Sequence, residues 1–449
     1  MTGAFAFLSS APARACAFLK PMPNQVLPFD QALATVLSHA AALAAPTATE
    51  TVPLLKVAGR TLAVPVLADR DQPPFDRSTR DGYAVRSTDS GSPLRLIGSI
   101  RAGQRWQGQP LGPGETIEIM TGAPLPAGAD AVVMVEHTTL EDGLLRVEPT
   151  RTLRIGENFV PRGAEACGDQ IVLPRGRRIA AAEITVAASC GCAQLEVFEQ
   201  PKVAIIATGD ELVELNEQPA PWQIRNSNSY ALKALVTAEG GFGGRLEIAR
   251  DTRADLFWRI SGGSMWDLML LSGGVSMGKY DLVEQVLTDF GAEFFFPGAL
   301  IQPGKPIVFG RLPKRGSFQT SETGEFSVPD TGPWRGEWTY FFGLPGNPVS
   351  TQVCFHLFVA PLLRALAGRT ELAPQFVEAK LAEDVPGGAK VTRFLPAELT
   401  SAWDGVTVRV VGWQGSGDVA ANARGNCYCV LPIGVESFKA GETVRVLLR

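Results

Sequence analysis

Short, unbroken apolar runs alternate with stretches of helical periodicity in the second half of the chain. Residues 202–208 (KVAIIAT) and 267–272 (DLMLLS) are rich in aliphatic side chains, as expected of strands that are buried on both faces. Residues 227–240 and 281–290 repeat apolar positions every three to four residues, which favours helices. The alternation predicts an open, doubly wound and mostly parallel α/β sheet.

The first half of the chain has a different pattern. Residues 27–45 carry apolar positions at helical spacing, with Asp30 as a candidate N-cap, and residues 178–189 have the pattern of a second helix. Most of the region from 51 to 200 consists of short β-rich runs separated by Gly, Pro and Asp turns. The 47 glycines and 33 prolines exceed the average share of about 12% for the two residues. We therefore expect short strands and many turns here, and no long helical bundle.

Composition excludes several classes of protein. The content of 45% hydrophobic and 19% charged residues predicts folded domains, and a net charge of −5 without a basic stripe argues against a nucleic-acid binder. No apolar run reaches the ~18 residues that cross a bilayer, so no membrane association is expected. Residues 1–26 lack a basic start and an unbroken apolar core, which favours a poorly ordered leader over a signal peptide.

The seven cysteines are scattered and odd in number, and two pairs, Cys190/Cys192 and Cys427/Cys429, have C-x-C spacing. No matching histidine pair accompanies them, so we interpret them as small buried side chains, with a metal site as the alternative. This cysteine usage fits a reducing, cytoplasmic location.

Glycine-rich turns follow three of the predicted strands, at 208–211 (TGDE), 272–276 (SGGVS) and 344–348 (LPGNP). Ligands of open α/β sheets bind beyond the carboxyl ends of the strands, where small residues expose backbone N–H groups to anions. Carboxylates and a lysine lie in or near these turns: Asp210, Glu211, Asp281 and Lys305. Anion-binding backbone beside carboxylates makes electrostatic sense if a cation such as Mg²⁺ bridges them. The alternative is that each turn is an ordinary turn with a helix cap.

Two common nucleotide-binding motifs are missing from the expected strand–turn–helix context. Neither a Walker A motif nor G-x-G-x-x-G occurs there, which excludes the standard ATPase and NAD-binding interpretations.

Residues 27–449 resemble the molybdopterin molybdenumtransferase family, MoeA of bacteria and the E domain of gephyrin. Motifs similar to those of the family occur in its order: PPFDRSTRDGYAVR (73–86), IMTGAPLPAGADAVVMVE (119–136), PRGAEACG (161–168), ATGDEL (207–212), RDTRADL (250–256), SGGVSMGKYD (272–281), PGKP (303–306), GLPGNPVS (343–350) and GSGDVAANARGNCYCVLP near the end. The resemblance implies a homodimeric transferase that inserts molybdate into the dithiolene of adenylylated molybdopterin, with Mg²⁺-dependent release of AMP. It also suggests the molybdopterin adenylyltransferase and molybdoenzyme maturation factors as partners.

Together with this resemblance, the patterns divide the chain into five parts. They are a leader at 1–26, an elongated linker or dimerisation domain at 27–72 and 150–200, a β-rich lobe at 73–149, an α/β molybdopterin-binding domain at 201–369 with an insertion at 313–337, and a C-terminal β-barrel-like domain at 370–449.

The resemblance also implies roles for single residues, by their place in the matching motifs. The residues implied in catalysis are Asp81, Glu165, Glu211, Asp251, Asp281 and Lys305. Three of them, Glu211, Asp251 and Asp281, are implied as Mg²⁺ ligands. The residues implied in substrate binding are Thr121, Thr208, Gly209, Asp210, Ser272, Gly273, Gly274, Ser276, Gly304, Pro345, Gly346 and Asn347. Asp81 is expected to reach the active site of the partner subunit.

Simpler interpretations remain for some of these residues. Asp81 is also placed to begin a turn, Asp251 and Asp281 are placed to cap helices, and Lys279 is interpretable as a surface charge.

The chain departs from the family pattern at three positions: Gln302 replaces a lysine, Glu165 replaces an aspartate, and Arg80 replaces a methionine. The first removes an anion-binding charge, and we expect Arg80 to restore part of it. These departures leave open a non-catalytic molybdopterin-binding or scaffold paralogue, a tungstate-specific transferase, and a phosphohydrolase that uses the same carboxylates. The polar insertion at 313–337 is expected to be a long surface hairpin or a disordered loop, with a partner site as a further alternative.

Overall fold

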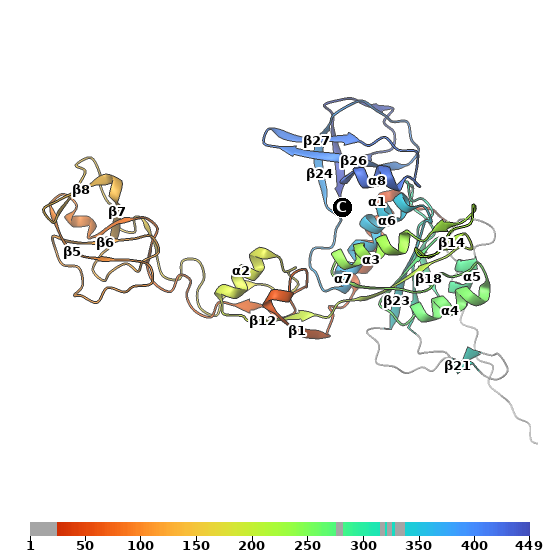
Figure 1. Ribbon diagram of the computed structural model, residues 1–449, viewed down its shortest axis with the longest axis horizontal. Helices are drawn as coiled ribbons and strands as arrows, with labels where there is room; N and C mark the ends of the chain where they lie inside the picture. The colour runs from red at the N-terminus through yellow and green to blue at the C-terminus, as the bar shows by residue number, and fades with distance from the viewer. Residues whose placement is uncertain (1–24, 275–281, 315–318, 321–325, 328–336) are drawn as a thin grey trace, which may run out of the picture. The chain divides into compact units, whose positions relative to one another are not determined.

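The computed structural model describes residues 25–274, 282–314, 319–320, 326–327 and 337–449 (Figure 1). The chain divides into two compact units. Unit 1 comprises Met1–Ala48 and Phe198–Arg449, and unit 2 comprises Thr49–Val197.

A six-stranded sheet forms the centre of unit 1, in the order β16-β13-β17-β23-β20-β18 (Figure 1). Its strands are β13 (Lys202–Ala207), β16 (Phe242–Arg245), β17 (Leu268–Ser272), β18 (Glu293–Phe296), β20 (Val308–Pro313) and β23 (Trp338–Leu344). The first four strands in this order are parallel, while β20 is antiparallel to both of its neighbours. The prediction of a mostly parallel sheet is thereby confirmed.

Helices cover both faces of this sheet, which explains the unbroken apolar runs. Along β13, Val203 and Ile205 pack in one core and Ala204 and Ile206 in the other. Helices on the first side are α1 (Phe29–Ala42), α3 (Asn228–Ala238), α6 (Pro348–Cys354) and α7 (Ala360–Leu366). Those on the second side are α4 (Arg253–Gly263) and α5 (Leu282–Asp289).

Helix α1 packs in the core of unit 1 through Ala32, Val36 and Ala40, although the sequence analysis assigned it to the linker domain. Its N-cap position is Pro28, so Asp30 is not the N-cap but lies in the first turn. There it still interacts favourably with the positive end of the helix dipole.

The helical stretch Pro348–Leu366 is interrupted by a π-helical turn at Phe355–Val359. Its length and composition would allow it to cross a membrane, but 83% of its apolar 18-residue stretch is buried inside the protein. It is therefore a core helix of unit 1.

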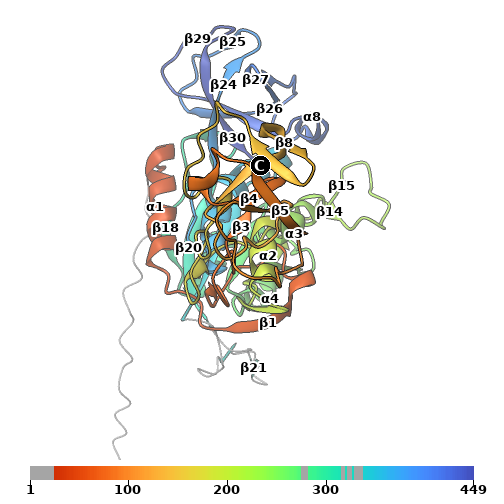
Figure 2. The same cartoon turned by 90° about the vertical axis from the view of Figure 1, so that its left-hand side faces the viewer.

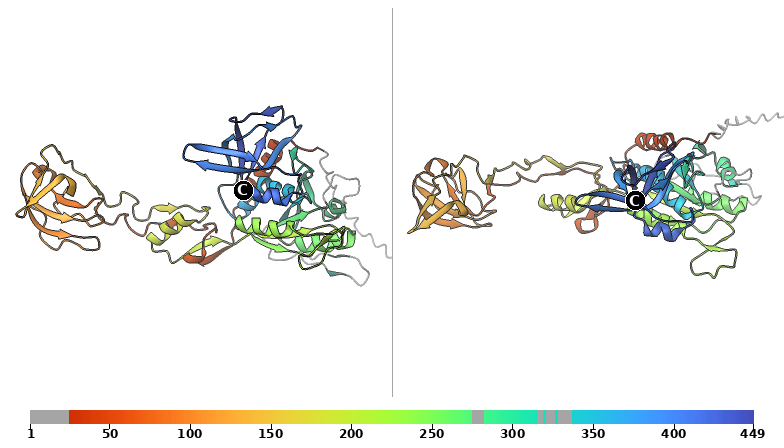
Figure 3. Two further views of the ribbon diagram at one scale, coloured as in Figure 1. Left: turned by 45° about the horizontal axis from the view of Figure 1, so that its top comes forward. Right: turned by 90° about the horizontal axis from the view of Figure 1, so that it is seen from above.

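The C-terminal part of unit 1 is a closed five-stranded barrel, as predicted (Figure 3). The ring runs β26-β27-β24-β30-β28 and closes through the pairing of β28 with β26, and a sixth short strand, β19 (Ile301–Gln302), adds to β26. The ring strands are β24 (Phe376–Leu381), β26 (Thr392–Ala402), β27 (Gly405–Val410), β28 (Cys427–Leu431) and β30 (Thr443–Leu448). A short pair, β25 (Val385–Pro386) and β29 (Ser437–Phe438), and the helix α8 (Val419–Arg424) complete it. Cys427 and Cys429 are fully buried in its core, in agreement with the interpretation of this pair as apolar side chains.

Unit 2 contains a six-stranded sheet in the order β7-β4-β6-β5-β9-β8. Its strands are β4 (Gly82–Val85), β5 (Leu94–Ile100), β6 (Glu115–Ile119), β7 (Ala131–Met134), β8 (Thr138–Glu141) and β9 (Leu144–Val147). The rest consists of helix α2 (Ala181–Ser189), three strand pairs and three 3₁₀ turns. The pairs are β1 (Thr49–Pro53) with β12 (Gln194–Phe198), β2 (Val66–Leu67) with β11 (Ile171–Leu173), and β3 (Arg77–Ser78) with β10 (Phe159–Val160). The turns are Leu54–Lys56, Ser87–Asp89 and Val135–His137.

Two further short strand pairs branch from the central sheet of unit 1. β14 (Leu212–Val213) pairs with β15 (Ile224–Arg225) beside α3 (Figure 2). β21 (Gln319–Thr320) pairs with β22 (Phe326–Ser327) within the insertion, between the antiparallel neighbours β20 and β23.

Candidate active site

Three loops of unit 1 meet where neighbouring parallel strands β13, β17 and β23 end. The backbone N–H of Thr208 donates to the carbonyl of Ser272 at 2.9 Å, and the N–H of Gly273 donates to the carbonyl of Leu344 at 3.1 Å. A Cβ added to Gly346 would lie only 3.7 Å from the Cα of Gly273. The glycine-rich turns that the sequence analysis selected one by one therefore form one edge of the sheet.

The middle loop requires glycine at two consecutive positions. Gly273 and Gly274 both have positive φ, +96° and +64°. A Cβ at Gly273 would lie 2.6 Å from the carbonyl oxygen of Thr208, and one at Gly274 would lie 2.6 Å from the Thr208 hydroxyl. The two glycines let this turn lie directly against the first loop.

The hydroxyl of Thr208 is buried between these loops without a hydrogen-bond partner. Thr208 is only 2% exposed, and its Oγ1 has no partner among the residues that the structure describes. A buried polar atom without a partner is costly, by about 1–3 kcal/mol. Such an atom in a glycine-lined turn is what a site that holds a polar ligand would present.

Asn228, at the first residue of α3, ties the second loop to the third. Its Nδ2 donates to the Ser272 hydroxyl at 2.9 Å and to the Gly346 carbonyl at 2.7 Å. From the sequence a helix was predicted over 227–240, but no role was predicted for Asn228. One signal in the sequence could have indicated such a role. Residues 226–229 (NSNS) are all polar, and they lie at the start of a helix that begins beside the strand ends.

The exposed carboxylates of Asp210, Glu211 and Asp251 lie beside the first loop. The N–H of Asp251 donates to Oδ1 of Asp210 at 3.3 Å, and the carboxylate of Glu211 folds back over Gly209, whose added Cβ would lie 2.7 Å from the Glu211 Cδ. The N-cap of α4 is Thr252, whose side chain accepts from Asp255, so Asp251 does not cap this helix. The structure thus brings these three residues together and removes the simpler interpretation of Asp251.

Arg250 holds the two acidic turns in place. Its Nη1 donates to the carbonyls of Leu212 at 3.1 Å and Asp210 at 3.4 Å, while its backbone N–H donates to Asp255 at 2.6 Å. The sequence analysis assigned no role to this arginine.

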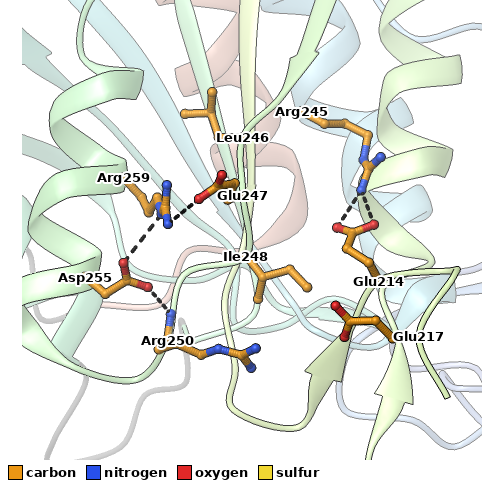
Figure 4. A pocket seen from close by; sticks show the side chains of 9 residues that line it. All are labelled: Glu214, Glu217, Arg245, Leu246, Glu247, Ile248, Arg250, Asp255 and Arg259. Carbon is orange, nitrogen blue, oxygen red and sulfur yellow. Dashed lines mark hydrogen bonds and ion pairs between the residues drawn. The ribbon is translucent and has the colours of Figure 1, made fainter. Parts of the chain in front are cut away.

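A polar cleft of about 570 Å³ is lined in part by Arg250 (Figure 4). Its charged side chains largely neutralise one another: Arg245 binds Glu214 at 2.7 and 2.8 Å, and Arg259 binds Glu247 at 2.7 Å. The cleft therefore has little free charge for an anion, in contrast to the neighbouring loops.

The third loop is fixed from two sides. Asn347 donates to the Ser416 hydroxyl at 2.7 Å, and Thr351 donates to the carbonyl of the buried Pro345 at 2.5 Å. Ser416 belongs to the C-terminal GSGD motif, in which Asp418 caps α8 by accepting from Ala421 at 2.9 Å. Ser416 was missed as a site neighbour because it is far away in sequence.

Gly304 is packed for structural reasons, while the adjacent Lys305 is exposed. Gly304 has a φ of +118°, and a Cβ there would lie 2.6 Å from Sγ of Cys354. Burial raises the pKa of the Cys354 thiol well above its usual range, so this thiol stays protonated and serves packing. Ser276, Lys279 and Asp281 lie outside the described residues, and their assigned roles stay predictions.

Asp81, Thr121 and Glu165 belong to unit 2. Oδ1 of Asp81 accepts from the Thr121 N–H at 2.7 Å and from its hydroxyl at 2.9 Å, and these hydrogen bonds lower the pKa of Asp81. Gly82 is required by the sheet, because a Cβ there would collide with the carbonyl of Val133. Glu165 forms an exposed ion pair with Arg77 at 2.8 Å. The pairing of Asp81 with Thr121 was not predicted.

Among the described residues, no group of three or more His, Cys, Asp or Glu side chains is arranged to enclose a metal ion. Because Asp281 is outside these residues, the predicted set of Glu211, Asp251 and Asp281 is not tested.

Comparison with known proteins first identifies the class. Residues 204–365, which contain the three loops, match the family described as a probable molybdopterin binding domain. Residues 27–191 match the MoeA N-terminal region (domain I and II), and residues 378–448 match the MoeA C-terminal region (domain IV).

Similar proteins cover nearly the whole chain. Molybdopterin molybdenumtransferase of Staphylococcus aureus is 34% identical over 411 residues, which cover 89% of this chain and 90% of that protein. The same enzyme of a Nostoc species is 34% identical, with 89% and 88% covered. A crystal structure of the molybdopterin biosynthesis MoeA protein from Pyrococcus horikoshii is 31% identical, with a TM-score of 0.67 and coverage of 94% and 99%. The chain belongs to the molybdopterin molybdenumtransferase family, and it is a transferase of molybdenum cofactor biosynthesis.

Proposed function

We propose that this chain transfers molybdenum from molybdate to the dithiolene of adenylylated molybdopterin, with Mg²⁺-dependent release of AMP. The observation that carries this proposal is the edge formed by the three loops. There a buried Thr208 hydroxyl, which has no partner in the described ranges, and two positive-φ glycines lie next to exposed carboxylates. Molybdate and the phosphates of this substrate are all anions. The glycine turns and hydroxyls would bind these anions directly, and the carboxylates would bind the cation that neutralises them.

The glycine turns supply the side that binds anions. Gly273, Gly274 and Gly346 leave the backbone accessible, and the hydroxyls of Thr208 and Ser272 are available as donors. Lys305 is exposed, and its ammonium forms no hydrogen bond or ion pair within the described part of the chain. Pre-placed donors of this kind stabilise oxyanions without reorganisation during the reaction.

The carboxylates of Asp210, Glu211 and Asp251 fit Mg²⁺ on the chemistry of their donors. Mg²⁺ prefers oxygen ligands, and it usually takes one or two carboxylates together with water and substrate phosphates, not a closed protein cage. An open arrangement of exposed carboxylates matches that habit. When bound, Mg²⁺ would neutralise charge on the phosphates as AMP leaves.

We propose further that the active protein is a homodimer in which Asp81, Thr121 and Glu165 complete the site of the partner subunit. Asp81 supports this because two hydrogen bonds from Thr121 hold its carboxylate ionised in an exposed position. A carboxylate held in this way is suited to meet a ligand or cation from another surface. Size measurement by light scattering, combined with activity of mixed dimers of Asp81 and Asp251 variants, tests this assembly.

The release of AMP tests the proposed reaction. Purified protein with adenylylated molybdopterin should release AMP only when molybdate and Mg²⁺ are both present, and chelation of Mg²⁺ should stop it. Tungstate in place of molybdate measures the preference between the two oxyanions. Release that is independent of both the oxyanion and Mg²⁺ would favour a phosphohydrolase, and substrate binding without release would favour the scaffold alternative.

A further inference from the structure

We propose that Asn228 is a positioning residue that turns the hydroxyl of Ser272 into a hydrogen-bond donor for an anionic oxygen of the substrate. This inference rests on the proposed function. It starts from the two contacts of the Asn228 amide, which join loops that are 44 and 118 residues away in the chain.

The contact with Gly346 fixes the orientation of the amide. A backbone carbonyl can only accept, so the Asn228 atom that lies 2.7 Å from the Gly346 oxygen must be the NH₂ group. The same Nδ2 atom lies 2.9 Å from Oγ of Ser272. Because an NH₂ group has no acceptor capacity, the Ser272 hydroxyl accepts this bond.

As a consequence, the O–H group of Ser272 is left available as a hydrogen-bond donor. A hydroxyl that accepts from Asn228 keeps its own O–H available, and this O–H donates to no acceptor within the described part of the chain. Ser272 is only 3% exposed and lies between the Thr208 and Gly346 loops. Its O–H is therefore held as a donor at the edge that the proposed function assigns to the anionic substrate.

The charge of the amide matters as much as its geometry. An aspartate at position 228 has nearly the same shape, but its oxygens only accept. It would repel the Gly346 carbonyl, draw the proton of Ser272 toward itself and place a negative charge beside the bound anion. Asn228→Asp should thus harm binding more than Asn228→Ala, which removes the contacts without reversing them.

A double-mutant cycle between Asn228 and Ser272 tests the inference. The measured quantity is the Kd for adenylylated molybdopterin without molybdate, so that binding is separated from turnover. Ser272→Ala should weaken binding about 10-fold, and Asn228→Ala about 3- to 10-fold, as expected for one hydrogen bond to a charged group. In the Ser272→Ala background, Asn228→Ala should add less than about 2-fold, because it acts through the serine.

Two controls keep the result interpretable. Ser227→Ala changes the exposed neighbour, which makes no side-chain cap bond, and should leave Kd unchanged. Thermal unfolding of every variant shows whether the fold is intact, and Asn228→Asp should bind at least about 10-fold more weakly than Asn228→Ala while still folded.

Equal effects of Asn228→Ala in both backgrounds, or wild-type binding by Asn228→Asp, would overturn the inference. Failure of the proposed function is a different result, since the wild-type protein would then release no AMP with molybdate and Mg²⁺ whatever the cycle shows.

Discussion

The two edges of the central sheet in unit 1 treat charge in opposite ways. At the edge where the strands β17 and β23 begin, Asp267 is nearly buried, and its carboxylate binds the Lys314 ammonium at 2.8 Å and the Lys202 N–H at 2.8 Å. At the edge where the strands end, Asp210, Glu211 and Asp251 are exposed, while the Thr208 hydroxyl is buried and has no hydrogen-bond partner among the described residues. The comparison separates charges that stabilise the fold from charges that are available to a ligand.

The largest effect is expected from the buried ion pair. Asp267→Ala removes the carboxylate that contacts the Lys314 ammonium, whose side chain is only 3% exposed. Removal of one partner of such a pair costs about 3–5 kcal/mol of unfolding free energy. Chemical denaturation measures this loss, and Glu383→Ala at the exposed Arg409–Glu383 pair is the control, with no measurable loss expected. A loss no larger than that of the control would contradict the distinction between the two edges.

His356 extends the comparison to pH. Burial, which outweighs the attraction of Glu239, lowers the pKa of His356 to about 4 from the usual 6.5, and Arg449 and Arg364 act in the same direction as burial. The unfolded chain therefore takes up this proton at a higher pH than the folded protein. The contribution of neutral His356 to the free energy of unfolding should be fully present above pH 6.5. It should fall by about 3 kcal/mol between pH 6.5 and pH 4.

Denaturation curves over this range measure the effect of pH, and His356→Phe should flatten the slope. An unchanged slope in that variant would assign the pH dependence to other groups.

Asp251 is an exposed carboxylate, in contrast to the buried Asp267. Asp251→Asn should lower the rate of AMP release about 100-fold, because it removes one of the carboxylates that the proposed function assigns to the cation and the phosphates. The unfolding midpoint should stay unchanged, since the side chain is exposed and caps no helix. Glu398→Gln on the exposed surface of the barrel is the control, with full activity expected. A destabilised but fully active Asp251→Asn variant would show that Asp251, like Asp267, serves the stability of the fold.

Thr208→Val gives the smallest effect and the sharpest contrast. The variant keeps the shape of the side chain and removes the buried hydroxyl, so it should be as stable as the wild type or slightly more stable. The Kd for adenylylated molybdopterin should rise about 10-fold, because the ligand loses a donor. Calorimetry and thermal unfolding measure the two quantities, and a clear loss of stability would show that the hydroxyl serves the fold.

The apolar pattern was sufficient to predict the central sheet. The runs at 202–208 and 267–272 contain no regular polar alternation, which is possible only when both faces are covered, and both strands are indeed buried on both faces. The order of the strands was not predictable, because it depends on long-range packing. The adjacency of the strands that end in the glycine turns therefore became visible only in the structure.

The polar partnerships were the least predictable part of the site. Asn228 and Ser416 contact the loops across 118 and 69 residues, and no local pattern reports such contacts. Lys314 was counted in the polar insertion, yet its charge is buried against Asp267. Local polarity shows that a side chain needs a partner, but it does not show whether that partner is the protein or a ligand.

Binding of Mn²⁺, used in place of Mg²⁺, tests whether the exposed carboxylates beside the first loop hold a divalent cation. Electron paramagnetic resonance measures the concentration of unbound Mn²⁺ in a titration of the protein that is saturated with adenylylated molybdopterin. We expect one tightly bound Mn²⁺ per chain, with an affinity at least about 10-fold weaker in Asp251→Asn and in Asp210→Asn, whose carboxylates would serve as ligands. Unchanged Mn²⁺ affinity in both variants, with substrate still bound, would contradict the claim that these exposed carboxylates hold the cation of the reaction.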